Sequence, residues 1–146
     1  MRIIALDPGV TTGVAIYRSD DNTPGRDPFE QFQFKGSHAE FWDIVLQRDD
    51  WNAIVYEKFT YQRRDRVELY PVQVIGVIRM YAQQEDIPEF SHTASAAKGL
   101  ITDDKLKKMG LWIPNLRHAM DATRHLMYHL IATRGEPQWL ESLRPR

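Results

Sequence analysis

The order of strand-like and helix-like segments constrains the fold of this chain more than any other feature. Three strand patterns come first, and two further short strands then alternate with helices. The turn signal Pro8-Gly9 indicates that the first two strands form a hairpin. We therefore predict a mixed five-stranded α/β sheet flanked by helices, with three antiparallel strands followed by two parallel ones. The expected strands are residues 2–6, 13–18, 29–34, 52–57 and 87–92, and the expected helices are residues 38–47, 66–84, 103–109 and 115–133.

The helical pattern over residues 66–84 is apolar on nearly all sides. A helix of this kind must be covered on more than one side. The sheet can cover one side, and a second subunit is expected to cover the other. The sequence therefore favours a homodimer.

Length and cysteine content restrict the class of protein. A chain of 146 residues fits one domain, expected over residues 1–146, and it contains no cysteine. This excludes disulfides and thiolate metal sites and favours a reducing, cytoplasmic compartment. No apolar run is long enough to span a membrane, and the N-terminal segment does not resemble a signal peptide, so no membrane partner is expected.

The charge is nearly balanced, with a net value of −1, but the basic residues are clustered. Such clusters on a neutral chain suit DNA binding, and they equally suit an ordinary solvated surface. One cluster is Arg63, Arg64 and Arg66, and the other is Lys98, Lys105, Lys107 and Lys108.

Acidic residues follow two of the predicted strands and recur on one helix face. Asp7 and Glu57 each end a strand at what should be the same sheet edge, while His118 and Asp121 are three residues apart on the last helix. Taken singly, Asp7 could be a turn former, Glu57 an exposed strand end, and the helix pair a solvated face. Together, these hard ligands favour a Mg²⁺ or Mn²⁺ site.

These residues carry a resemblance to a known family. The segments Leu6-Asp7-Pro8-Gly9, Val55-Tyr56-Glu57 and His118-Ala119-Met120-Asp121-Ala122, with the spacing from Phe90 to Lys98, resemble the RuvC family of Holliday junction resolvases. That family belongs to the RNase H-like superfamily, and the resemblance spans nearly the whole chain. The short segment between Lys98 and Lys105 is similar to phage-encoded members, for which the host cytoplasm is the expected location.

The resemblance implies a homodimeric endodeoxyribonuclease that resolves four-way junctions and other branched DNA in recombination or repair. It implies that Asp7 bridges two metal ions, that Glu57 binds one of them, and that His118 and Asp121 complete the sites. Two ions would clamp the scissile phosphate, which gives nicks with 5′-phosphate and 3′-hydroxyl ends. Lys98 would stabilise negative charge on that phosphate.

The segment after Glu57 interleaves aromatic residues with cations, which suits stacking on unpaired bases. Phe59 and Tyr61 are the candidates, although Phe59 is as readily expected to pack under the loop. Farther along the last helix, His125 is expected to support the metal ligands and His129 to lie on the surface, because helix rise carries His129 away from the strand ends.

Three other functions compete with a junction resolvase. A sugar-kinase or actin-like ATPase shares the Asp-x-Gly loop at Asp7, but it needs a second domain that 146 residues do not supply. Another RNase H-like nuclease, either a ribonuclease H or an exonuclease, would use the same residues. A catalytically inactive DNA-binding relative is disfavoured, because all four ligand positions hold competent side chains.

Overall fold

The computed structural model describes residues 1–20, 24–61 and 68–140, and these form one twisted sheet between two helical layers. The strand order is β3-β2-β1-β4-β5. β2 pairs antiparallel with β1 and β3, whereas β4 pairs parallel with β1 and β5. The predicted mixed sheet is confirmed. Its strands are β1 Arg2–Asp7, β2 Thr12–Arg18, β3 Phe29–Phe34, β4 Ala53–Glu57 and β5 Glu89–His92.

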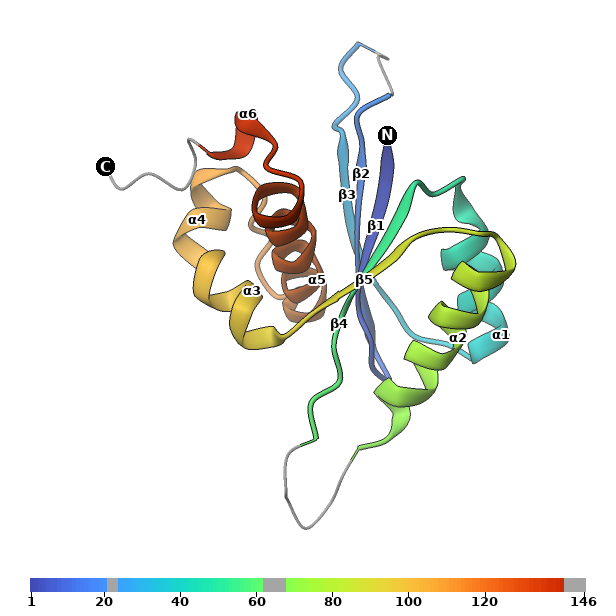
Figure 1. Ribbon diagram of the computed structural model, residues 1–146. Coiled ribbons are helices and arrows are strands. Elements are labelled where there is room, and N and C mark those ends of the chain that lie inside the picture. The colour runs from blue at the N-terminus through green and yellow to red at the C-terminus, as the bar shows by residue number, and fades with distance from the viewer. Residues whose placement is uncertain (21–23, 62–67, 141–146) are drawn as a thin grey trace.

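Helices cover both faces of the sheet, which Figure 1 shows edge-on. On one face lie α3 Ala94–Leu100, α4 Asp103–Lys108, α5 Arg117–Tyr128, the π-helical turn η3 His129–Thr133 and α6 Pro137–Leu140. On the other face lie α1 His38–Glu40, the π-helical turn η1 Phe41–Val45, the 3₁₀ turn η2 Leu46–Arg48 and α2 Tyr70–Gln84.

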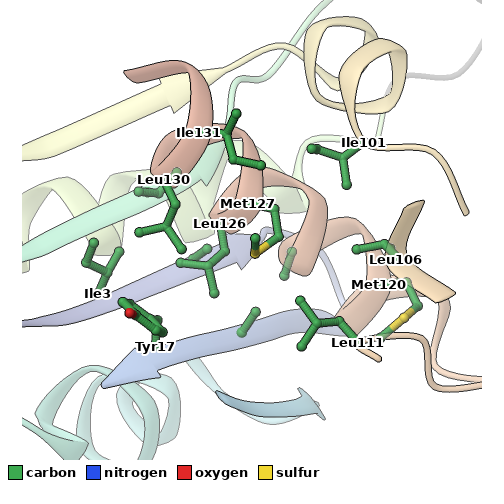
Figure 2. Packing of buried hydrophobic residues seen from close by; sticks show 14 of the residues in the cluster. Ile3, Tyr17, Ile101, Leu106, Leu111, Met120, Leu126, Met127, Leu130 and Ile131 are labelled. Carbon is green, nitrogen blue, oxygen red and sulfur yellow. The ribbon is translucent and has the colours of Figure 1, made fainter. Parts of the chain in front are cut away.

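Alternation along the central strands divides the core in two. Ile3 and Ala5 of β1 belong to the cluster under α5, whereas Ile4 and Leu6 pack on the α2 side. Figure 2 shows the first cluster, in which Leu126 of α5 and Leu130 of η3 lie over the sheet. Because both faces are covered, the central strands are apolar almost throughout, and their ends are held in fixed positions.

Two predicted helices begin later than the sequence pattern indicated. The helix expected from residue 66 begins at Tyr70, since Pro71 lacks the N–H that an interior position would use and fits only the first turn. Residues 66 and 67 lie outside the described part. The helix expected from residue 115 begins at Arg117, because Asn115 has a left-handed φ of 64°.

Two further differences concern helices of the core layers. The helix predicted over residues 38–47 begins with the expected Ser37–Glu40 capping box but continues as a π turn and then a 3₁₀ turn. Helix α3, which begins after the cap residue Thr93, was not predicted. Among the described residues, no helix combines the length and apolar composition needed to cross a membrane.

Candidate active site

The sheet topology brings Asp7 and Glu57 to one edge. They end β1 and β4, which are parallel neighbours with Leu6 opposite Tyr56. Helix α5 crosses the same strands, and its first turn lies against the start of β2. A Cβ placed on Gly13 would lie 1.8 Å from the carbonyl oxygen of His118. Glycine at this position lets the helix approach closely enough to place His118 beside Asp7.

Each of the three carboxylates is bound by a basic neighbour through one oxygen. Nδ1 of His118 lies 2.9 Å from Oδ2 of Asp7, and Nε2 of His125 lies 3.0 Å from Oε2 of Glu57. Nη1 of Arg124 donates to Oδ1 of Asp121 at 2.7 Å, and Nζ of Lys98 lies 3.5 Å from the same oxygen. These contacts involve β1, β4, α3 and α5. The three carboxylates also interact electrostatically, since Glu57 and Asp121 both act on Asp7, so the predicted residues Asp7, Glu57, Lys98, His118 and Asp121 lie in one region.

The electrostatics of Asp7 show how close the three acids are. The pKa of Asp7 is raised to about 6. Burial is the main cause and the charges of Glu57 and Asp121 add to it, while the hydrogen bond from His118 lowers the pKa. A carboxyl group close to two other carboxylates is stabilised either by binding a proton or by binding a cation. Asp7 is therefore the point at which this site most needs positive charge.

The donor chemistry of the site fits a hard divalent cation. Among the described residues, no group of three or more acidic or imidazole side chains stands in metal-binding geometry. Each carboxylate has one oxygen bound by a basic neighbour. The other oxygens (Asp7 Oδ1, Glu57 Oε1 and Asp121 Oδ2) have no hydrogen-bond partner in the described part of the chain. Three carboxylates and one imidazole match the preference of Mg²⁺ or Mn²⁺.

The lysines expected to bind DNA differ in their surroundings. Lys98 is half-exposed and contacts Asp121. Nζ of Lys105 donates to the carbonyl of Leu100 at 2.7 Å, and Nζ of Lys107 lies 5.2 Å from the ring centroid of Trp112. Lys108 ends α4 with its side chain exposed. Of the four, Lys98 is the one that the fold brings to the carboxylates.

The loop after Glu57 borders a cavity of about 410 Å³ beside the site. Phe59 lines this cavity and is partly buried, whereas Tyr61 is 66% exposed. Pro71 and Ile75 of α2 form part of the opposite wall. Arg63, Arg64 and Arg66, predicted to contact DNA, lie outside the described residues.

Two buried residues, Arg124 of α5 and His129 of η3, differ from what the sequence led us to expect. Arg124 is buried and forms ion pairs with Asp121 and Asp103, and its Nε donates to the carbonyl of Ile101. Its position three residues after Asp121 was the available signal. His129, expected on the surface, is only 1% exposed, because its ring packs beside Phe90 of β5. That prediction was wrong, and burial lowers the pKa of His129 to about 4.

Known structures match this fold although sequences do not. No protein-family model and no curated protein matches the chain. The structure of Thermus thermophilus RuvC in complex with a Holliday junction substrate aligns with a TM-score of 0.69 at 17% identity, covering 93% of this chain and 97% of that chain. A second structure of T. thermophilus RuvC aligns with a TM-score of 0.65 at 15% identity over the whole of both chains.

A viral structure also aligns. The fowlpox virus Holliday junction resolvase gives a TM-score of 0.53 at 13% identity, covering 90% of this chain and 99% of that chain. At such identities the likeness concerns the fold. The chain has the RuvC type of RNase H-like fold over its described residues.

Proposed function

We propose that this chain, which has a RuvC-like fold, is a metal-dependent endonuclease that cuts branched DNA, including four-way junctions. The observation that carries the proposal is the position of Asp7, which is hydrogen-bonded to His118 and lies within the repulsive field of Glu57 and Asp121. The choice of substrate is supported by the solved neighbours, two of which are described as Holliday junction complexes or resolvases.

In this proposal, Asp7, Glu57, His118 and Asp121 hold two Mg²⁺ or Mn²⁺ ions. When bound, such ions activate a water nucleophile and neutralise charge on the phosphate and on the leaving oxygen. Asp7 supplies a largely buried carboxylate, whose attraction for a cation is little screened by solvent. We assign to the reaction the products of resolvases, nicks with 5′-phosphate and 3′-hydroxyl ends.

Among the described residues, two cations contact Asp121, and Lys98 is the more exposed of the two, since Arg124 is buried. The ammonium of Lys98 lies 3.5 Å from Asp121 while half of its side chain is exposed, so it can reach a phosphate oxygen without leaving the carboxylates. A fixed positive charge beside a reacting phosphate stabilises the extra negative charge that develops there. Lys98 is therefore proposed as a catalytic residue.

Further residues of the chain are proposed to contact DNA. Tyr61 and Phe59 are positioned on the loop directly after Glu57, where an exposed ring can stack on an unpaired base. Contacts to the DNA backbone are assigned to the two basic clusters. These are Arg63, Arg64 and Arg66 in one segment and Lys105, Lys107 and Lys108 in the other.

The decisive experiment compares wild type with Asp7→Asn on a four-way junction, a Y-fork and a linear duplex, with Mg²⁺, Mn²⁺ or EDTA. We expect cutting of branched DNA that requires metal and that falls by about 10³-fold or more in the variant, because a charged ligand contributes several kcal/mol to the transition state. Asp43→Asn, which changes an exposed acid of η1, is the matched control and should cut like wild type.

The possible results separate the competing functions. Cutting in EDTA, or full activity of Asp7→Asn, would overturn the metal mechanism. Equal cutting of linear duplex would point to a less selective RNase H-like nuclease such as an exonuclease, whereas a ribonuclease H would leave all three DNA substrates uncut. Tight junction binding with no cutting under either metal would identify a catalytically inactive DNA-binding relative.

A further inference from the structure

The side chain of His125 is buried yet contacts a proposed metal ligand. It is 1% exposed, and its Nε2 lies 3.0 Å from Oε2 of Glu57. The contact joins α5 to the end of β4 across 68 residues of sequence. His118, Asp121 and His125 follow one another at spacings of three and four, so they form one stripe that runs from Asp7 toward Glu57.

The surroundings of His125 determine where its proton lies. Nδ1 is buried and has no hydrogen-bond partner within the described residues. A proton on Nδ1 would be a buried donor without an acceptor, which is unfavourable. A proton on Nε2 is donated to the carboxylate of Glu57. The ring of His92 lies parallel to that of His125, at 6° with centroids 6.5 Å apart, and it lines the other side of this enclosed position.

We propose that His125 is a positioning residue, which uses its Nε2–H to fix the Glu57 carboxylate so that Oε1 is presented for metal binding. The inference rests on the proposed metal-dependent function. Oε2 is occupied by His125, and Oε1 has no partner in the described part of the structure. A hydrogen bond that removes the rotational freedom of a carboxylate ligand lowers the entropy cost of binding the ion.

The isosteric pair His125→Gln and His125→Met tests this role. The amide N–H of glutamine reaches about as far as Nε2 and can donate to Glu57, whereas methionine has a similar length and no donor. Mn²⁺ binding is measured by electron paramagnetic resonance on the whole protein without DNA. We expect His125→Met to bind Mn²⁺ about 10–100-fold more weakly than wild type and His125→Gln to stay within about threefold of it.

Stability provides a readout that separates positioning from packing. Methionine suits a buried position at least as well as glutamine, so thermal unfolding in EDTA should rank His125→Met at or above His125→Gln, opposite to the order of metal affinity. His129→Met is the control for loss of a buried histidine on the same helix, since His129 contacts Phe90 and His92 rather than a proposed ligand. Its Mn²⁺ affinity should equal that of wild type.

A tautomer measurement checks the hydrogen bond in the unmodified protein. Long-range ¹H–¹⁵N correlation spectra should show His125 protonated at Nε2 and bare at Nδ1. A Nδ1–H tautomer, equal Mn²⁺ affinity of the Gln and Met variants, or a wild type that binds no Mn²⁺ would each overturn the inference. A wild type that binds Mn²⁺ in a His125-dependent way but leaves junctions uncut would contradict the proposed function and leave the role of His125 standing.

Discussion

Asp7 lies in a place that is unfavourable for its own charge. Burial is the largest cause of its raised pKa of about 6, and the neighbouring Glu57 and Asp121 add repulsion that the hydrogen bond from His118 only partly offsets. Active sites commonly hold such groups, because the binding of a cation or substrate relieves the strain that folding imposes. The charge of Asp7 should therefore lower the free energy of unfolding measurably when no metal is present.

In EDTA, Asp7→Asn should be more stable than wild type at pH 7.5 and equally stable near pH 4. The folded pKa of about 6 lies above the usual carboxyl value of 3.8, so protonation of Asp7 favours the fold. This contribution is fully present below pH 3.8 and is lost as the pH rises through 6. Asparagine stays neutral throughout. We expect a gain of about 1–3 kcal/mol at pH 7.5, measured by urea unfolding at both pH values.

The control for this prediction is Asp43→Asn, an exposed change that should alter stability by less than about 0.5 kcal/mol at either pH. Saturating Mn²⁺ should reverse the order, since an ion that binds only the folded wild type raises its free energy of unfolding. A less stable Asp7→Asn at pH 7.5 in EDTA would contradict this account of the Asp7 environment.

The sequence was sufficient to predict which acids would meet, but not how each is held. Asp7 and Glu57 were predictable because parallel strands end at a common edge, and His118 and Asp121 because they share a helix face. The role of Arg124 depends on Asp103 and on the carbonyl of Ile101, which are brought near only by the packing of α3 and α4. No local pattern encodes such contacts.

At the scale of elements, strands were predicted more accurately than helices. Strands of this sheet are bounded by strong turn signals, and β3 has the predicted bounds Phe29–Phe34. Helix α3 was missed because its seven residues, rich in alanine, show no clear apolar stripe. This omission matters, since α3 carries Lys98 and brings its ammonium to Asp121.

The contact between α5 and β2 yields a prediction about how elements are positioned. Gly13→Ala places a methyl group 1.8 Å from the backbone carbonyl oxygen of His118. Because the atoms in the way belong to a backbone and not to a flexible side chain, the clash can be relieved only by moving β2 or α5. We expect unfolding free energy to fall by about 3 kcal/mol or more and Mn²⁺ affinity to fall with it, because His118 is displaced from Asp7. Urea unfolding and Mn²⁺ titration measure the two effects.

Gly99→Ala is the matched control for that change. Nothing lies within 4 Å of a Cβ at Gly99, and the residue is inside α3, where alanine should raise stability by about 0.5–1 kcal/mol. If Gly13→Ala were as stable as wild type, α5 would not be held against β2 as closely as the geometry indicates.

At the scale of the whole molecule, the two helical layers differ in what they leave exposed. Of the six large apolar side chains exposed among the described residues, three belong to the start and outer face of α2. Leu69, Val72 and Met80 are 58%, 42% and 58% exposed, and with Gly76 they follow helical spacing along one side. The opposite side of α2 packs on the sheet. We therefore expect a second copy of the chain to cover the exposed stripe.

Met80→Glu should therefore separate dimer formation from catalysis. A carboxylate within an apolar interface would weaken association by at least tenfold for each 1.4 kcal/mol of desolvation cost, giving monomers at micromolar concentration by sedimentation. On a supercoiled plasmid that extrudes a cruciform, wild type should make paired incisions and release linear DNA. The monomeric variant, with its carboxylates intact, should release nicked circles and bind Mn²⁺ normally.

Thr133→Glu adds the same charge at an exposed position of η3 in the opposite layer, so it should sediment and cut like wild type. A wild type that is monomeric at micromolar concentration, or a Met80→Glu variant that still yields linear DNA, would remove α2 from the interface. The single site would then have to cut the two strands in succession. Nicked circles would in that case precede linear product even for wild type, which the time course of the same assay reveals.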